Sequence, residues 1–228
     1  MKPAATLVLF DIDGTLLRGA GQHHRQALVD GICEVTGVAT SMDGISPSGM
    51  LDRDLIAAML RASGQSDRRI QRSLRRIMDA CQDSYCANCT LELQQFLCPG
   101  VQDTLTALRS RGAILGLVTG NLSRIGWRKM ELAGLREHFS AGAFAEDGRT
   151  RARLAQVARQ RAIKAGLIHR NARVSLIGDH PNDIEAARAN GFRSIAVATG
   201  LISRETLQAS APDVLVSTLR DLDIATLL

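Results

Sequence analysis

Two carboxylates at the end of an apolar run are the residues best suited to catalysis in this sequence. Residues 7–10 (LVLF) lead to Asp11, and Asp13 stands two positions later, followed by Gly14 and Thr15. Two like charges this close raise each other's pKa, so they need a cation or a shared proton. A calcium loop needs a further Asp or Asn before its glycine, and none is present here. The pair therefore predicts a metal site or an acid–base pair, with an ordinary Asp-Gly turn as the alternative.

A second pair of carboxylates lies in residues 174–191 (VSLIGDHPNDIEAARANG). Asp179 follows the apolar run 174–178, and Asp183 comes four residues later, where a helix is expected to begin. Neighbouring strand ends would bring Asp179 beside Asp11. Ligation by oxygen alone suits Mg²⁺, which takes one or two carboxylates and keeps several waters. For Asp183 the alternative is a helix-start acid that accepts free backbone N–H groups.

A third candidate is the turn at Thr119, Gly120 and Asn121, which ends the apolar run 114–119. A hydroxyl and free backbone N–H groups at such a turn can hold a phosphate. Taken alone, these three residues are equally typical of a plain strand-end turn.

Alternating strand and helix patterns must position these groups. The predicted strands are the apolar runs 6–11, 114–119, 174–178, 194–198 and 214–216. The predicted helices are residues 101–111, 122–133, 152–165 and 182–190, and a glycine follows each. This alternation predicts an α/β fold, a Rossmann-like parallel sheet covered on both faces, which binds ligands at the carboxyl ends of its strands.

Residues 18–97 interrupt the alternation, because they show helical periodicity and almost no strand pattern. The alternation of strand and helix patterns resumes after Pro99 and Gly100. We therefore expect a catalytic core of residues 1–17 and 98–228, with a helical domain of residues 18–97 inserted after the first strand.

The order of these motifs resembles the haloacid dehalogenase-like superfamily of hydrolases: DxDGT, then a strand ending in Thr, then GDxxxD. The resemblance covers nearly the whole chain and is greatest to phosphoglycolate-phosphatase-like members, which insert a helical C1 cap between the first two motifs. It implies a Mg²⁺-dependent phosphatase acting on a small phosphate monoester, of phosphoglycolate or sugar-phosphate type.

The resemblance also implies catalytic roles for the matching residues. Asp11 would be the nucleophile that forms an aspartyl-phosphate, and Asp13 would protonate the leaving alcohol and later activate water. Thr119 and the Gly120 N–H would bind the transferring phosphoryl group.

Further matching residues would hold the metal and the substrate. Mg²⁺ would be held by Asp11, Asp179 and the backbone carbonyl of Asp13, with Asp183 in support. Gly14, Thr15 and Asn121 are expected to contact the substrate.

The family further requires one basic side chain, usually a lysine, before the GDxxxD motif. Residues 142–162 contain no lysine. We expect Arg151 to take this role, since arginine is a permanent bidentate phosphate binder. Arg149, Arg153 and Lys164 are the alternative candidates. A further alternative is that these basic residues only form the solvated face of a helix.

Within the inserted segment, residues 46–56 resemble the G-x-T-D stretch of phosphoglycolate-phosphatase-like members. Gly49, Asp52 and Arg53 would face the active site there. Leu51 replaces the usual Thr, which departs from ordinary glycolate recognition. The alternative role for Asp52 is that of a helix cap.

Composition excludes several other classes of protein. The chain has 228 residues, 45% of them apolar, which is enough for a sizeable core. No apolar run reaches the length of a membrane span, and the first residues do not match a signal peptide, so we expect a cytoplasmic protein with no membrane partner. The net charge of +5 comes with only 3% aromatic residues, so we expect no nucleic-acid partner. The arginine-rich run 68–76 is better explained as a solvated helix face.

Cysteine and histidine residues give weaker signals. Cys81, Cys86, Cys89 and Cys98 lie within 18 residues, but their spacing does not fit zinc, so free thiols are expected. His23 and His24, at the start of the first inserted helix, are expected to face solvent, with a position facing the substrate as the alternative.

The expected partner is a small phosphorylated metabolite, bound by a monomer or a homodimer. A phosphomutase of the same superfamily and a non-catalytic regulatory relative are the alternatives. Retention of Asp11, Asp13, Thr119 and Asp179 favours a catalyst.

Overall fold

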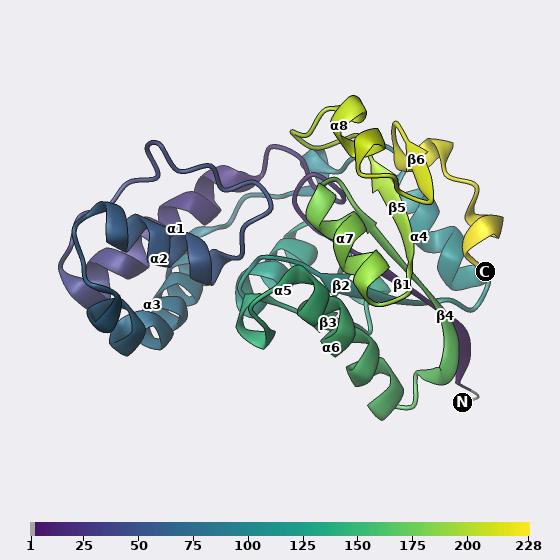
Figure 1. The fold of residues 1–228 in the computed structure, drawn as a ribbon, viewed down its shortest axis with the longest axis horizontal. Helices are drawn as coiled ribbons and strands as arrows, with labels where there is room; N and C mark the ends of the chain where they lie inside the picture. The colour runs from purple at the N-terminus through teal and green to yellow at the C-terminus, as the bar shows by residue number, and fades with distance from the viewer. Residues whose placement is uncertain (1–2) are drawn as a thin grey trace.

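A central parallel sheet organises the computed structural model, which describes residues 3–228 (Figure 1). The strands are β1 Ala4–Phe10, β2 Ile114–Val118, β3 Ala141–Ala143, β4 Ile168–Gly178, β5 Arg193–Val197 and β6 Val214–Val216. They pair in the order β3-β2-β1-β4-β5-β6, and every pairing is parallel. β1 therefore lies between β2 and β4, and the carboxyl ends of these three strands are neighbours.

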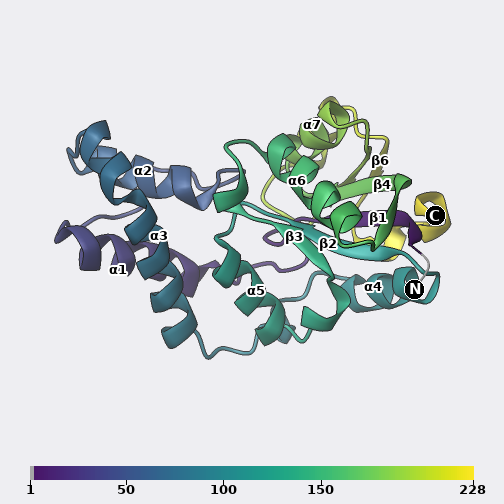
Figure 2. The ribbon, with the colours of Figure 1, turned by 90° about the horizontal axis from the view of Figure 1, so that it is seen from below.

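Helices cover both faces of the sheet. The α-helices in residues 3–228 are α1 Gly21–Thr36, α2 Asp52–Ala62, α3 Asp67–Asn88, α4 Val101–Ser110, α5 Ser123–Leu132, α6 Arg151–Lys164, α7 Pro181–Ala189 and α8 Arg204–Ala209. Helices α4 and α5 lie on one face and α6 and α7 on the other (Figure 2). Alternate residues of β1 serve the two faces: Leu7 and Leu9 pack in the core with α6, whereas Val8 and Phe10 pack with α4. The predicted α/β class is confirmed.

The predicted core helices differ from the observed ones by one residue at most. One strand and one α-helix of the core are not predicted from the sequence. β3 has the sequence AGA, which carries no apolar run, and it forms by pairing with the edge of β2. α8 is a short helix that begins at an Ser203 cap. β4 also begins six residues earlier than expected, because its first part is polar and exposed.

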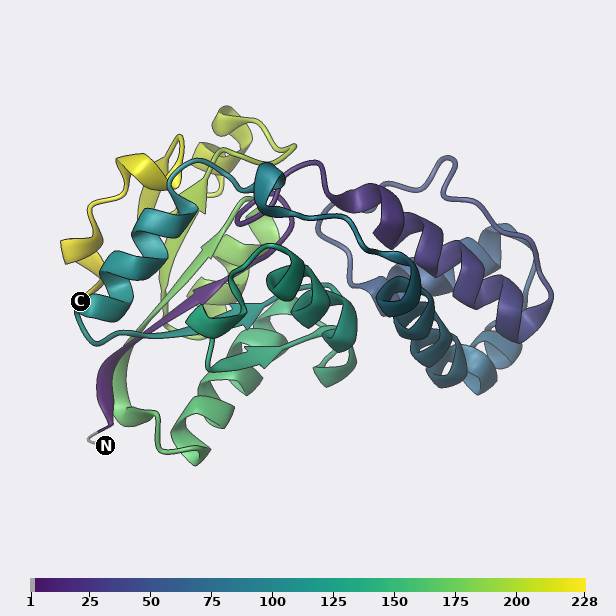
Figure 3. The same ribbon diagram turned by 180° about the vertical axis from the view of Figure 1, so that it is seen from behind.

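Helices α1, α2 and α3 pack on one another at one end of the molecule, away from both chain termini (Figures 1 and 3). We name residues Gly21–Asn88 the helical insert. Its interior includes Leu28, Ile32, Ile77 and Cys81, all almost fully buried. The arginines of the run 68–76 are exposed on the outer face of α3, as expected.

The five cysteines are free, as expected, and Cys33 is exposed. Among residues 3–228, only an aspartate cluster has the arrangement of a metal site. None of the helices in this range combines the length and the apolar character needed to cross a bilayer.

Candidate active site

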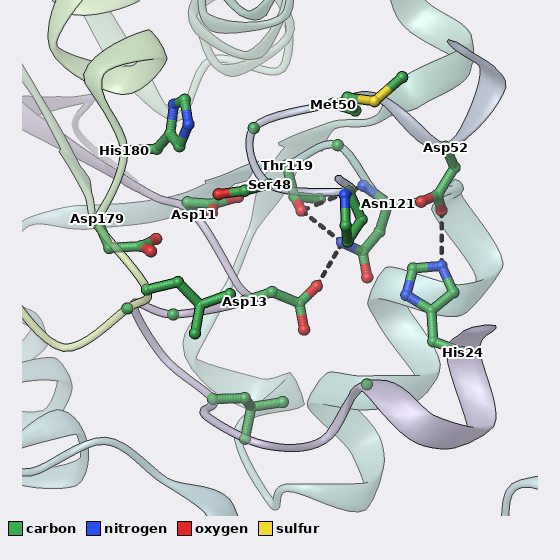
Figure 4. Close-up of a pocket in the computed structure, with 18 of the residues that line it drawn as sticks. Asp11, Asp13, His24, Ser48, Met50, Asp52, Thr119, Asn121, Asp179 and His180 are labelled. Atoms are coloured by element: carbon green, nitrogen blue, oxygen red, sulfur yellow. Dashed lines mark hydrogen bonds and ion pairs between the residues drawn. The ribbon is translucent and has the colours of Figure 1, made fainter. Parts of the chain in front are cut away.

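The carboxyl ends of β1, β2 and β4 open into a cavity of about 330 Å³ between the sheet and the helical insert. β1 leads to Asp11, β2 to Thr119 and β4 to Asp179, and all three side chains point toward this space (Figure 4). The core wall also includes Gly14 and Gly120. Residues more than a hundred positions apart in the chain thus meet because parallel strands end at the same edge.

Three buried carboxylates form the first cluster of the site. Asp11, Asp179 and Asp183 each offer an oxygen, and these oxygens lie within 4.8 Å of one another. Burial and the neighbouring Asp11 charge raise the pKa of Asp179 and of Asp183. Oδ1 of Asp183 accepts no hydrogen bond. A hard divalent cation fits this set, because it would satisfy the open oxygen and offset the crowded negative charge.

Asp179 is held in this cluster by its neighbours. Thr15 Oγ1 donates a hydrogen bond of 3.1 Å to Asp179 Oδ1. At Gly14, φ is +92°, and a Cβ there would lie 2.2 Å from the Asp179 carboxylate. Thr15 is fully buried and does not line the cavity. Its side chain orients Asp179, and its position differs from the predicted one in contact with the substrate.

Arg151 supplies the positive charge beside this cluster. Its Nη1 donates to Asp11 Oδ1 at 2.8 Å, and its Nε lies 3.3 Å from Asp183 Oδ1. The side chain is only 8% exposed and lines the cavity. The three alternative basic residues, Arg149, Arg153 and Lys164, are exposed. Of the four candidates, Arg151 is therefore the one that the structure brings to Asp11.

Asp13 belongs to a second cluster on the other side of the cavity. Its carboxylate accepts hydrogen bonds from Lys129 Nζ at 2.7 and 2.8 Å and from Asn121 Nδ2 at 2.7 Å. Partial burial opposes ionisation, but the charge of Lys129 and the hydrogen bonds from Lys129 and Asn121 lower the pKa of Asp13. Asn121 Nδ2 also donates to Thr119 Oγ1 at 3.0 Å, which links this cluster to β2 (Figure 4).

Comparison with known proteins identifies the family. A sequence model of the haloacid dehalogenase-like hydrolases matches residues 5–191. The chain belongs to this family. The predicted class of enzyme, a phosphoric monoester hydrolase, is confirmed by this match together with relatives named as phosphatases.

Two such relatives are phosphoglycolate phosphatases. The protein of Synechococcus elongatus is 30% identical over 227 residues, which cover 94% of this chain and 94% of that protein. The Escherichia coli protein is 31% identical over 127 residues, which cover 56% of this chain and half of that protein.

Solved structures share the fold of this hydrolase. CbbY from Rhodobacter sphaeroides, in complex with phosphate, has a TM-score of 0.73 and 21% identity, over 98% of this chain and 99% of that one. β-Phosphoglucomutase from Clostridium difficile has a TM-score of 0.69 and 16% identity, over 98% of this chain and 95% of that one.

The helical insert forms the opposite wall of the hydrolase's cavity. Its loop before α2 reaches the core at Gly49, whose carbonyl accepts a hydrogen bond of 3.0 Å from Asn182 Nδ2. φ at Gly49 is +72°, and a Cβ there would lie 2.4 Å from the His180 ring. The Asp52 N–H donates to the Gly120 carbonyl at 2.8 Å.

Arg53, in the first turn of α2, differs from the expectation that it faces the active site. Arg53 lies outside the cavity wall, next to Asp54, because it is one helical position past Asp52 and turns to another face of α2. Leu51 is 4% exposed and packs in the core.

His24 and Lys129 are the functional residues that sequence reasoning missed. His24 is buried, not solvent-facing as predicted, because its Nε2 lies 2.9 Å from Asp52 Oδ2 and its Nδ1 lies 3.1 Å from Lys129 Nζ. Lys129, for which no role is predicted, is fully buried. One signal points to it: Lys129 lies four residues after Ile125 and next to Met130, on the apolar face of its helix.

Proposed function

We propose that this hydrolase is a Mg²⁺-dependent phosphatase that cleaves small phosphate monoesters through an aspartyl-phosphate on Asp11. The observation that carries the proposal is the setting of Asp11. Asp11 directly follows β1, a strand in the middle of the sheet. Its carboxylate accepts a hydrogen bond from Arg151 and lies with Asp179 and Asp183 in a cluster that could hold a metal ion.

The first chemical step transfers the phosphoryl group to the protein. An Asp11 oxygen attacks phosphorus, the bond from phosphorus to the ester oxygen breaks, and Asp13 gives that oxygen a proton. The Thr119 hydroxyl and the Gly120 N–H bind the oxygens of the phosphoryl group during transfer. Arg151 holds the attacking carboxylate and offsets the charge that the substrate brings.

The second step returns the protein to its starting state. Asp13 takes a proton from water as the water oxygen attacks phosphorus, and the bond from phosphorus to Asp11 breaks to release phosphate. The lowered pKa of Asp13 favours the ionised carboxylate that this base step needs, whereas the first step needs the protonated form. Mg²⁺ bound by Asp11, Asp179, Asp183 and the Asp13 backbone carbonyl would neutralise phosphoryl charge, so that an anion can approach an anion.

We further propose that residues 18–97 form a cap domain that closes over the core. The two connections lie side by side, since the Arg18 N–H donates to the Phe96 carbonyl and the Cys98 N–H to the Leu16 carbonyl, each at about 2.8–2.9 Å. Paired connections of this kind can act as a hinge. A cavity of about 330 Å³ suits substrates that are small molecules.

The substrate class we favour carries a second anionic group, as 2-phosphoglycolate does. Arg18 and Arg25 line the cavity and are exposed at its mouth. Either guanidinium could pair with a carboxylate on the substrate. The relatives from Synechococcus elongatus and Escherichia coli, named phosphoglycolate phosphatase, support the same choice.

The experiment that tests the proposal measures phosphate release by the whole chain from 2-phosphoglycolate, a sugar phosphate and p-nitrophenyl phosphate, with and without Mg²⁺. The Asp11→Asn variant should release none above background. Asp43, an exposed acid in the insert, provides the matched control Asp43→Asn, which should resemble the unmodified protein. Equal turnover by Asp11→Asn and the unmodified protein would refute the proposal.

A further inference from the structure

Lys129 is a charged side chain with no exposure at all, on a helix of the core. A buried ammonium group is costly unless each of its N–H groups finds a partner. Three partner atoms are present: Asp13 Oδ1 and Oδ2 at 2.8 and 2.7 Å, and His24 Nδ1 at 3.1 Å. The side chain of Asp13 is 41% exposed, so Lys129 holds from beneath a carboxylate that faces the cavity.

The contact with His24 fixes the protonation pattern of that ring. A lysine ammonium only donates hydrogen bonds, so Nδ1 of His24 must accept one. The ring proton is therefore on Nε2, which donates to Asp52 Oδ2 at 2.9 Å (Figure 4). Tyr85 packs edge-on against the ring of His24, with 6.0 Å between ring centroids, and limits its rotation.

Asp52 closes the chain of contacts back onto the core. Its Oδ2 also accepts a hydrogen bond of 2.8 Å from the backbone N–H of Leu122, the residue before α5. The helical insert therefore contacts α5 through Asp52 at its start and through His24 at Lys129, in addition to the bonds from α3 to Ser123 and Arg124. One continuous line of polar contacts therefore joins four side chains in the order Asp13, Lys129, His24 and Asp52.

We propose that Lys129 is a positioning residue for the acid–base step, and that His24 and Asp52 make its hold on Asp13 depend on docking of the helical insert. The inference rests on the proposed phosphatase function. When the insert is docked, Lys129 has its full set of partners and Asp13 is fixed toward the cavity. When the insert moves away, Lys129 loses His24 and Asp13 is held less firmly.

Two substrates with different leaving groups distinguish a residue that positions the proton donor from a residue that only supports the structure. The alcohol released from 2-phosphoglycolate needs a proton as it leaves, whereas p-nitrophenolate leaves readily without one. In Lys129→Met, kcat/KM, which includes only the steps up to departure of the leaving group, should fall by about 10²-fold for 2-phosphoglycolate and by less than about tenfold for p-nitrophenyl phosphate. The value of kcat also includes hydrolysis of the aspartyl-phosphate with Asp13 as base, so it should fall for both substrates. The matched control is Lys164→Met, because Lys164 is exposed at the end of α6.

Dependence on the insert is tested with His24→Gln, alone and combined with Lys129→Met. His24→Gln should show the same preference for p-nitrophenyl phosphate, with a loss of about tenfold on 2-phosphoglycolate. Because His24 acts through Lys129, the double variant should lose no more than Lys129→Met alone. The single His24→Gln variant keeps the test decisive if Lys129→Met fails to fold.

Two results would overturn the inference. One is an equal loss of kcat/KM on both substrates in Lys129→Met or His24→Gln, which marks a general structural effect. The other is additive losses in the double variant, which shows that His24 does not act through Lys129. If the unmodified protein is active on both substrates, either of these results refutes the inference but not the proposed phosphatase function. An unmodified protein inactive on both refutes the two together.

Discussion

Asp11 and Asp13 are separated by one residue, yet the two clusters in which they lie differ in both charge and origin. The Asp11 cluster adds Asp179 and Asp183, so it gathers three carboxylates around the single cation of Arg151. The Asp13 cluster sets one carboxylate against a buried lysine and an amide. The first cluster needs an external cation for balance, whereas the protein itself balances the second.

The two clusters also draw on different parts of the molecule. The Asp11 cluster is built from strand ends and the start of two helices of the core. The Asp13 cluster reaches into the helical insert through His24 and Asp52. It follows that core residues alone can form the metal site, whereas proton transfer by Asp13 can depend on the position of the insert.

The largest expected effect is loss of the nucleophile in the first cluster. Asp11→Asn should lower phosphate release by at least about 10³-fold on every substrate, because no covalent intermediate can form. Phosphate release measured beside the Asp43→Asn control checks it. A loss confined to substrates with poor leaving groups would instead give Asp11 the role that we assign to Asp13.

Removal of the metal should have the next largest effect. Chelation with EDTA should lower turnover by at least about 10²-fold, and added Mg²⁺ should restore it. Mg²⁺ should also stabilise the folded chain by about 2.7 kcal/mol at 100 times its Kd, since it binds only the folded form. Thermal unfolding of the unmodified protein and of Asp179→Asn checks this: an equal rise in midpoint for both would place the metal elsewhere.

Loss of the cation in the first cluster should follow. Arg151→Met should lower kcat/KM by about 10²-fold for both leaving groups, because it removes a preorganised donor beside Asp11. Arg149→Met, at an exposed position two residues earlier, is the matched control. Equal kinetics for these two variants would contradict the assignment of Arg151.

The smallest effect should come from the cavity mouth. Arg25→Ala should raise KM for 2-phosphoglycolate by about two- to fivefold, as expected for an exposed ion pair. KM for p-nitrophenyl phosphate, which lacks a carboxylate, should stay the same. Equal changes in KM for the two substrates would argue against recognition of a second anion by Arg25.

The first cluster could be predicted from the sequence because local patterns determine it. Apolar runs mark the strands, and Asp11 and Asp179 directly follow two of them. The spacing of Asp183 places it at the next helix start. Parallel pairing then brings these groups together, and Arg151 is the candidate cation whose helix begins beside them.

The second cluster could not be predicted in the same way. Whether His24 faces water or Lys129 depends on how the insert packs on α5, and no local pattern encodes that contact. A lone lysine on an amphipathic helix is normally solvated, so the burial of Lys129 becomes evident only once Asp13 and His24 are seen to contact its ammonium group. The short β3 escaped prediction for a related reason, since pairing with β2 and not its own composition forms it.

The central claim is that the two clusters perform separate tasks, the first holding the metal and the second directing the proton. The most direct test measures the Mg²⁺ dependence of kcat for Asp183→Asn and Lys129→Met on 2-phosphoglycolate and on p-nitrophenyl phosphate. Asp183→Asn should raise the Mg²⁺ concentration for half-maximal turnover by about tenfold or more and affect both substrates alike. Lys129→Met should leave that concentration unchanged and lower kcat/KM selectively for 2-phosphoglycolate. The same shift in Mg²⁺ dependence, or the same substrate selectivity, in both variants would contradict the claim.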